Sequence, residues 1–195
     1  MRCTFGMPEV SPSLPVWRPR LAQVGDVPSL AVLIPVSVHA LQAPHYSAAQ
    51  RTAALGPVFG VDRQLIHDQT YFVVEAAGQI VGGGGWSRRR SGYGGDGGRA
   101  TEDPLLDPAR DPARIRAFFV HPAWARRGIG RSIMAASESA IVEAGFRAAE
   151  IIATLAGEPL YAAFGYTVIE RPQIPLPAGL SLAVVRMSKR LPGPA

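Results

Sequence analysis

The 195-residue sequence predicts one domain of the α/β (α+β) class, and three observations support this prediction. The chain is long enough to enclose a hydrophobic core, since 47% of its residues are hydrophobic and 18% are charged. Segments with helical periodicity are interspersed with segments of strand-forming residues. The sequence has no internal repeat and no compositional boundary. We therefore expect a single domain over residues 16–190, preceded by a flexible, proline-interrupted tail over residues 1–15.

The first part of the chain is expected to contain a short strand and two helices. Residues 16–23 are the candidate strand. Asp26 can cap a helix that has Pro28 in its first turn and apolar residues at helical spacing as far as Leu41. Ser47 can cap a second, shorter helix that ends near Leu55.

The middle of the chain predicts a hairpin and a long insertion. Residues 70–75 and 79–86 are candidate strands joined by a short turn that contains glycine. The second strand includes four consecutive glycines, Gly82 to Gly85, which predicts that neighbouring groups pack closely on its backbone. Residues 88–112 are rich in glycine and Asp-Pro pairs, so we expect a mobile insertion there, either a lid or a disordered segment.

The C-terminal half predicts alternating strands and helices. A strand at residues 114–120 leads through an arginine- and glycine-containing loop into an amphipathic helix, which Gly145 ends. After this helix we expect a strand at 150–154, a short helix at 158–164 and two strands at 166–171 and 182–188.

The charge of the chain is carried by arginine. The formal net charge is +5, and 19 of the 20 basic residues are arginines, the exception being Lys189. Guanidinium groups favour bidentate contacts with phosphate, which indicates an anionic partner. Nucleic acid would require basic residues interleaved with aromatic residues on one face, and the sequence lacks that pattern, so we expect no nucleic-acid partner.

Cysteine and histidine are scarce. Cys3 is the single cysteine, and the four histidines have no ligand spacing, which argues against a disulfide framework and against a metal site. The longest apolar run, residues 30–38, is too short to span a bilayer and contains Pro35. We therefore expect a cytoplasmic protein that makes no membrane contact.

The most informative unit is the sequence of strand, arginine-glycine loop and helix. Gly128 and Gly130 allow a ligand to approach the backbone, and the first N–H groups of the helix are suited to bind a pyrophosphate. A Rossmann loop is excluded because position 133 is Ile and the loop does not follow the strand at once. A Walker loop is excluded because Lys189 is too far along the chain.

Residues 120–130, Val-His-Pro-Ala-Trp-Ala-Arg-Arg-Gly-Ile-Gly, closely resemble the acyl-CoA loop of the GCN5-related N-acetyltransferase (GNAT) superfamily. Leu160-Tyr161 and Phe164-Gly165-Tyr166 resemble a second signature of that superfamily, and the similarity extends over residues 70–169. The resemblance implies a central mixed, mostly antiparallel sheet flanked by helices. It also implies that two strands splay apart at the acyl-CoA site.

The resemblance also implies that acetyl-CoA is the cosubstrate and that no metal takes part. Main-chain groups of Phe118, Phe119 and Val120 would pair with the pantetheine arm. Thr154 stands where an Asn is common in the superfamily and can still form a hydrogen bond. The pyrophosphate would be held by the loop residues Arg126, Arg127, Gly128, Ile129, Gly130 and Arg131.

Tyr161 matches the tyrosine that, in such enzymes, protonates the departing CoA thiolate. The general base is not assigned, because Arg114 and Arg116 occupy the strand on which some members carry a glutamate. The candidates for this base are Asp62, Glu75, His121 and Glu158, and water can also relay the proton.

The expected reaction is direct transfer of acetyl from acetyl-CoA to an amine of a small molecule or peptide, within a ternary complex. The alternative is a non-catalytic acyl-CoA-binding or regulatory module on the same fold, and a blocked acceptor pocket would favour that reading. If Arg88, Arg89 and Arg90 face the acceptor pocket, they favour an acidic acceptor, whereas a solvated charge run is the commoner role. The sequence is also compatible with a homodimer.

Overall fold

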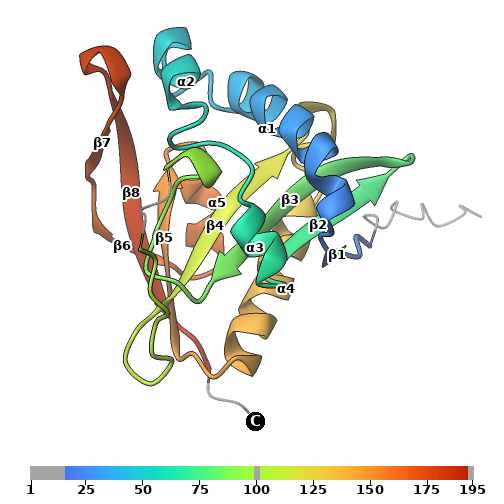
Figure 1. The fold of residues 1–195 in the computed structure, drawn as a ribbon, viewed down its shortest axis with the longest axis vertical. Helices are drawn as coiled ribbons and strands as arrows, with labels where there is room; N and C mark the ends of the chain where they lie inside the picture. Colours follow the sequence, from blue (N-terminus) through green and yellow to red (C-terminus); the bar gives the residue numbers. More distant parts are fainter. Residues whose placement is uncertain (1–15, 99–101, 193–195) are drawn as a thin grey trace, which may run out of the picture.

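The computed structural model describes residues 16–98 and 102–192, shown in Figure 1. The tail expected at residues 1–15, with Cys3, lies outside the described residues. The elements in chain order are β1 (Arg20–Leu21), the 3₁₀ helix η1 (Val24–Asp26), α1 (Val27–Leu41), α2 (Ala48–Ala54), α3 (Arg63–His67), β2 (Tyr71–Ala76), β3 (Gln79–Ser87), η2 (Asp96–Gly98), β4 (Ala113–Val120), η3 (Pro122–Trp124), α4 (Ile129–Glu143), β5 (Ala148–Thr154), α5 (Glu158–Ala163), β6 (Thr167–Glu170), β7 (Gln173–Pro175), η4 (Pro177–Gly179) and β8 (Ser181–Arg190).

The strands form one mixed sheet in the order β1-β2-β3-β4-β5-β8-β6, and β7 also pairs with β8. Strands β4 and β5 run parallel, while the other strand pairs of the described chain are antiparallel. The predicted single domain with a mixed, mostly antiparallel sheet is therefore confirmed. The candidate strand at 16–23 is shorter than predicted, since β1 covers two residues.

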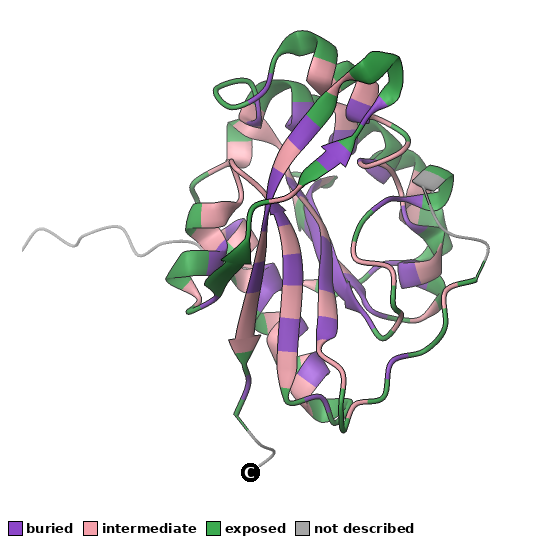
Figure 2. Cartoon of the chain, turned by 90° about the vertical axis from the view of Figure 1, so that its left-hand side faces the viewer, coloured by how far each residue is buried: buried purple, intermediate pink, exposed green. Residues whose placement is uncertain are grey.

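Helices cover both faces of the sheet. On one face, Leu30 and Leu33 of α1 pack with Tyr71 and Val73 of β2. On the other face, α4 packs against Val74 and the neighbouring strand β3. Successive residues of a strand point to opposite faces, so α1 and α4 lie on opposite sides. Figure 2 shows the buried residues concentrated between these layers.

Most helix ends in the structure lie where local capping signals in the sequence predict them. Ser47 and Gln50 form a capping box at the start of α2. Gly145, with a φ of +90°, follows the end of α4. By length and composition alone the helical stretch Val24–Leu41 is apolar enough to cross a membrane, although 28% of it is buried inside the structure. The sequence predicts this helix as far as Leu41, and Pro35 lies inside α1 without ending it.

The four glycines of β3 are required by close packing. A Cβ atom added at Gly83 would lie 2.9 Å from the Tyr71 hydroxyl, and one at Gly84 would lie 2.7 Å from the Phe118 ring. Added Cβ atoms would also collide with the Ile129 side chain at Gly82 and with the Thr70 carbonyl at Gly85. The expected close approach to this backbone is therefore confirmed, and the absence of side chains on these glycines allows Phe118 of β4 to pack against β3.

Candidate functional site

The sheet opens between its two parallel strands. Within the described chain, β4 pairs with β5 along Ala113–Ile115 and Ala149–Ile151. Beyond that point Ala117 has a φ of +56°, which is uncommon for a residue with a side chain, and the register of β4 on β3 shifts. The buried Tyr71 hydroxyl donates a hydrogen bond of 2.8 Å to the Ala117 carbonyl and so holds this bulge. The predicted splay of two strands is thus present.

Main-chain groups of β4 line the opening. The His121 N–H donates to the Val81 carbonyl of β3 over 2.8 Å, so by strand alternation the main-chain groups of Phe118 and Val120 face away from β3 and toward β5. Those of Phe119, which pairs with Gly83, face β3. The Val120 N–H donates to the Ser37 hydroxyl of α1 at 3.2 Å. The opening therefore presents the main chain of Phe118 and the carbonyl of Val120.

A cavity of about 80 Å³ fills the opening. Its walls are residues 115–119 of β4 and 151–154 of β5, with Tyr161 of α5. From the α1 side of the sheet the lining is completed by Gln42, Val58, Phe59, Gly60, Tyr93, Gly92, Gly94, Gly95, Ile174 and Val184. The cavity therefore connects the splayed strands with the helices and loops that come before and after them in the chain.

Tyr161 is buried in this wall. Its ring meets the rings of Phe118 and Tyr166 edge-on, with centroids 6.0 and 6.2 Å away. Burial raises the pKa of Tyr161, so the phenol stays protonated at neutral pH and is suited to donate a proton. Thr154 shapes the turn before α5, because its hydroxyl accepts a hydrogen bond from the Gly157 N–H at 3.2 Å. Thr154 also lines the cavity.

The arginine-glycine loop joins β4 to α4 at the end of the opening. Arg126 and Gly128 both have positive φ, +63° and +90°. Gly128 is the N-cap of α4 and supplies no side-chain cap, so the N–H groups at the helix start are available to an anion. A Cβ atom at Gly130 would lie 3.2 Å from Leu160 of α5, which shows how closely α5 approaches the loop.

Aromatic residues hold the loop and its arginines. The Arg127 guanidinium lies over the Trp124 ring at 5.1 Å, and that of Arg131 lies over the Phe164 ring at 5.4 Å. Trp17, which the sequence reasoning did not single out, donates its indole N–H to the Arg127 carbonyl at 2.6 Å and meets Trp124 edge-on. Contacts between residues so far apart in the chain leave no local signal in the sequence.

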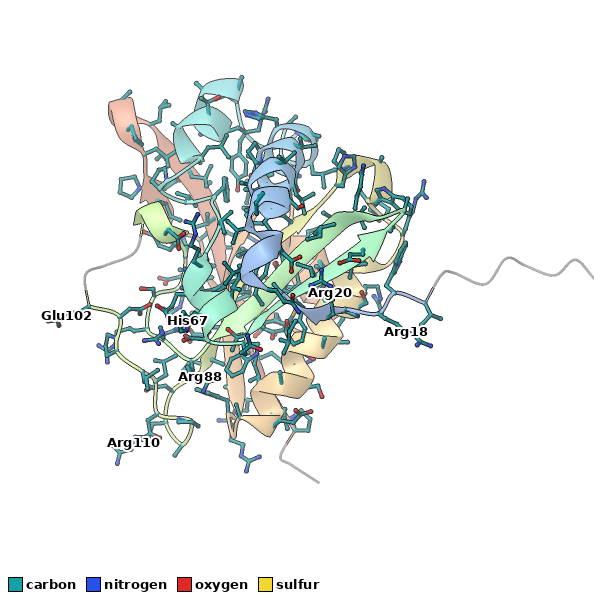
Figure 3. The ribbon with its side chains drawn as sticks, turned by 45° about the vertical axis from the view of Figure 1, so that its right-hand side comes forward. Arg18, Arg20, His67, Arg88, Glu102 and Arg110 are labelled. Carbon is teal, nitrogen blue, oxygen red and sulfur yellow. The ribbon has the colours of Figure 1, made fainter. Side chains whose placement is uncertain are left out.

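The four candidate bases lie outside the cavity lining. Asp62 forms a buried ion pair of 2.9 Å with Arg116, whereas Glu158 forms a partly exposed ion pair of 2.6 Å with Arg171. Glu75 pairs with Arg20 on β1, which is labelled in Figure 3. His121 caps η3 by accepting the Ala123 N–H at its Nδ1 atom. The structure therefore places Tyr161 in the cavity wall, but not these four side chains.

The arginine run at 88–90 divides between two environments. Arg88 lies over the Trp86 ring at 5.6 Å, and Arg89 pairs with Asp68 at 2.8 Å. Arg90 lines a hollow beside the cavity together with Arg114, Arg186, Glu150 and Glu170. One of the three arginines, Arg90, therefore lies in a hollow that adjoins the cavity.

The described parts of the insertion are tied to the sheet. Arg116 donates to the Ser91 carbonyl at 3.1 Å and to the Gly94 carbonyl, and the Ser91 N–H donates to Asp103 at 2.8 Å. Gly92 and Gly94 line the cavity. The insertion therefore forms part of the cavity wall, while its mobility stays a prediction.

The comparisons with known proteins assign this arrangement to a class. Residues 67–168, which include the splayed strand pair, the arginine-glycine loop and the start of α4, match the family model described as "Acetyltransferase (GNAT) domain". The chain belongs to this family, as the sequence resemblance predicted. A search of curated proteins gives no significant match.

Solved structures share the fold over nearly the whole chain. A GCN5-related N-acetyltransferase from Rhodopseudomonas palustris is 22% identical, with 94% of this chain and 100% of that chain covered and a TM-score of 0.66. The PaiA N-acetyltransferase from Thermoplasma acidophilum, in complex with coenzyme A, is 11% identical, with 90% and 99% covered and a TM-score of 0.62. The yncA protein from Salmonella typhimurium, with acetyl-CoA, is 18% identical, with 93% and 97% covered and a TM-score of 0.61.

Proposed function

We propose that the chain is an acyl-CoA-dependent N-acetyltransferase that transfers acetyl from acetyl-CoA to an amine within a ternary complex. The observation that carries the proposal is the position of Tyr161, which lines a cavity at the point where β4 and β5 separate. A non-catalytic module would need neither an open acceptor cavity nor a buried phenol within it, so these two features favour the enzyme.

The loop residues fit the pyrophosphate of acetyl-CoA. Gly128 leaves the start of α4 without a side-chain cap, and Arg126, Arg127 and Arg131 add positive charge beside it. Each charge-assisted hydrogen bond to a phosphate contributes about 1.5–3 kcal/mol. The pantetheine arm would pair with the main chain of Phe118 and with the Val120 carbonyl, because these groups face the opening.

Tyr161 would act as the general acid. An ordinary phenol has a pKa near 10 and a thiol one near 8.5, so proton transfer to the thiolate is uphill by about 2 kcal/mol. Burial raises the pKa of Tyr161 further, and burial of the departing thiolate raises the proton affinity of that sulfur in the same direction. The phenol is therefore a suitable donor in this cavity, and general acid catalysis contributes about 10²–10⁴-fold.

The experiment compares the wild type with Tyr161→Phe, using thiol release from acetyl-CoA over a panel of amines and calorimetric binding of coenzyme A. The expected result is a loss of turnover of at least about 100-fold with binding unchanged within about twofold. Unchanged turnover would remove Tyr161 as the acid. Tight binding of coenzyme A without thiol release for any amine would favour the non-catalytic module instead.

A cytoplasmic location, the lack of nucleic-acid or membrane partners, the lack of a metal and the formation of a homodimer stay predictions from the sequence. Over the described residues, the structure contains no group of three or more His, Cys, Asp or Glu side chains that could hold a metal ion.

A further inference from the structure

We infer that the acceptor carries a carboxylate as well as the reacting amine, and that the hollow beside the cavity binds this carboxylate through Arg90 and Arg114. The inference rests on the proposed function and names the substrate class of that same site. It follows from the position of the hollow, from the balance of its charges and from two buried polar atoms that have no partner.

The hollow continues the cavity on the face of the sheet that α1 covers. The two spaces share Gly92, Ile151 and Ile152 as lining residues, and the hollow has a volume of about 220 Å³. Ile152 packs in one cluster with Ile34 and Val38 of α1, whereas α4 covers the other face. A ligand in the hollow therefore lies on the face opposite to α4, whose start is expected to hold the pyrophosphate.

The arginines of the hollow outnumber its glutamates by one. Glu150 accepts hydrogen bonds from Arg114 and Arg186, and Glu170 pairs with Arg186. The remaining arginine, Arg90, is exposed and forms no ion pair within residues 16–98 and 102–192. One surplus positive charge matches a carboxylate, which is a monoanion, better than it matches a phosphate with up to two negative charges.

Arg114 contributes a donor that no described protein group uses. One of its terminal nitrogens binds Glu150, but its Nε atom is buried and has no hydrogen-bond partner in the described structure. A buried N–H group without a partner is destabilising, so a ligand oxygen that reaches it removes this penalty. A carboxylate has two acceptor oxygens and can bind Arg114 and Arg90 at the same time.

Gln42 is suited to hold the amine end of the same acceptor. This residue is the C-cap of α1, lines the cavity and is 7% exposed. Its Oε1 atom is buried without a hydrogen-bond partner in the part of the chain that the structure describes. A carboxamide oxygen accepts N–H groups, so an amine in the cavity can donate to it. The amine would then share the cavity with Tyr161, while the carboxylate would occupy the hollow.

The boundary between the two spaces limits the length of the acceptor. Gly92 lines both spaces, and a Cβ atom added to it would lie 3.1 Å from the Cδ1 atom of Ile152. Because the cavity and the hollow share walls, a short aliphatic chain is enough to join an amine in one to a carboxylate in the other. The inferred acceptor is therefore a small amino acid or a related amino carboxylate.

The experiment compares amino acids with their own primary amides by thiol release from acetyl-CoA. Glycine, β-alanine and γ-aminobutyrate vary the chain length, and each amide removes the negative charge at nearly constant size. At the best length we expect kcat/KM for the acid to exceed that for its amide at least about threefold, through KM, and we expect added salt to reduce this ratio. Equal values for acid and amide at every length would overturn the inference. A stronger preference for an aminoalkylphosphonate of the same length would contradict the assignment to a carboxylate.

Variants test the role of the hollow. Arg90→Gln removes the surplus charge, so it should raise KM for the acid about three- to tenfold and bring the ratio of acid to amide toward one. Gln42→Leu should raise KM for acid and amide alike. Arg110→Gln is the matched control, because Arg110 is 84% exposed, lies in the insertion (Figure 3) and does not line the hollow, so the ratio should stay as in the wild type. Equal effects of Arg90→Gln and Arg110→Gln on the ratio would overturn the inference.

A binding measurement separates this inference from the proposed function. Titration calorimetry of each acid and its amide into the protein saturated with coenzyme A measures acceptor binding without turnover, and we expect the acid to bind more tightly. Thiol release without any preference for the acid would overturn the inference alone. Tighter binding of the acid without thiol release from acetyl-CoA would refute the proposed function, and with it the role of the bound acid as acceptor.

Discussion

Substituting Phe for Trp17 removes one hydrogen bond beside the arginine-glycine loop and keeps most of the ring packing. The indole N–H donates to the Arg127 carbonyl at 2.6 Å. The peptide bond that follows is trans, so this carbonyl and the Gly128 N–H point in opposite directions. We therefore expect the hydrogen bond from Trp17 to hold the Arg127 carbonyl away from the expected phosphate and the Gly128 N–H toward that phosphate.

The expected loss is that of one ordinary hydrogen bond. Its net contribution of about 0.5–1.5 kcal/mol corresponds to about a 2- to 12-fold increase in the Kd of coenzyme A. Because the Trp17 and Trp124 rings meet edge-on at 5.8 Å, a phenylalanine can keep much of that contact. Titration calorimetry of the wild type and the variant measures the change directly.

Pantetheine is the matched ligand, because it has no pyrophosphate and cannot use the loop. Its Kd should be the same for both proteins. Equal weakening of coenzyme A and pantetheine would refute the reasoning, as would a lower melting temperature with no change in the Kd of coenzyme A. Either result would mean that the hydrogen bond stabilises the fold without orienting the loop.

Three further substitutions test other parts of the structure. Gly128→Glu should abolish coenzyme A binding, because the φ of +90° at this position strains any side chain and the new carboxylate repels phosphate. Wild-type affinity in calorimetry would mean that the loop is misassigned. Gly84→Ala should destabilise the protein by about 1–3 kcal/mol, since the added Cβ meets the Phe118 ring, and an unchanged urea midpoint would contradict that packing. Burial would raise the pKa of Asp68, but hydrogen bonds from Arg89 and Gln64 outweigh it, so this pKa lies below its ordinary value of 3.8. The ionised Asp68 carboxylate therefore stabilises the folded state above pH 3.8, and this stabilisation is lost as the pH falls through the lower folded-state pKa. In urea unfolding measured against pH, Asp68→Asn should lose less stability than the wild type in that acidic range. An unchanged acidic part of the profile would exclude this contribution.

The sequence predicts elements whose signals are local. The cap at Ser47, the stop at Gly145 and the hairpin around Gly78 each depend on a few neighbouring residues, and the structure has all three. The short elements α3 and β7 were missed, since five and three residues carry too little periodic signal.

The parts of the site that the sequence could not supply depend on contacts between distant residues. The bulge at Ala117 requires Tyr71, and the Val120 N–H donates a hydrogen bond to Ser37 of α1. Arg116 stands where a base was sought and is paired with Asp62, itself one of the candidates. Such pairings arise when separate elements pack, so no spacing rule reveals them.

The short pairing of β4 with β5 has a mechanical consequence. Three residue pairs join a half-sheet of β1 to β4 with a half-sheet of β5 to β8, so little backbone hydrogen bonding carries force across the middle of the molecule. A ligand arm that hydrogen-bonds to β4 in the gap would add a further connection between the two half-sheets. Amide protons on both sides of the seam should then exchange more slowly with solvent, far beyond the residues that the ligand touches.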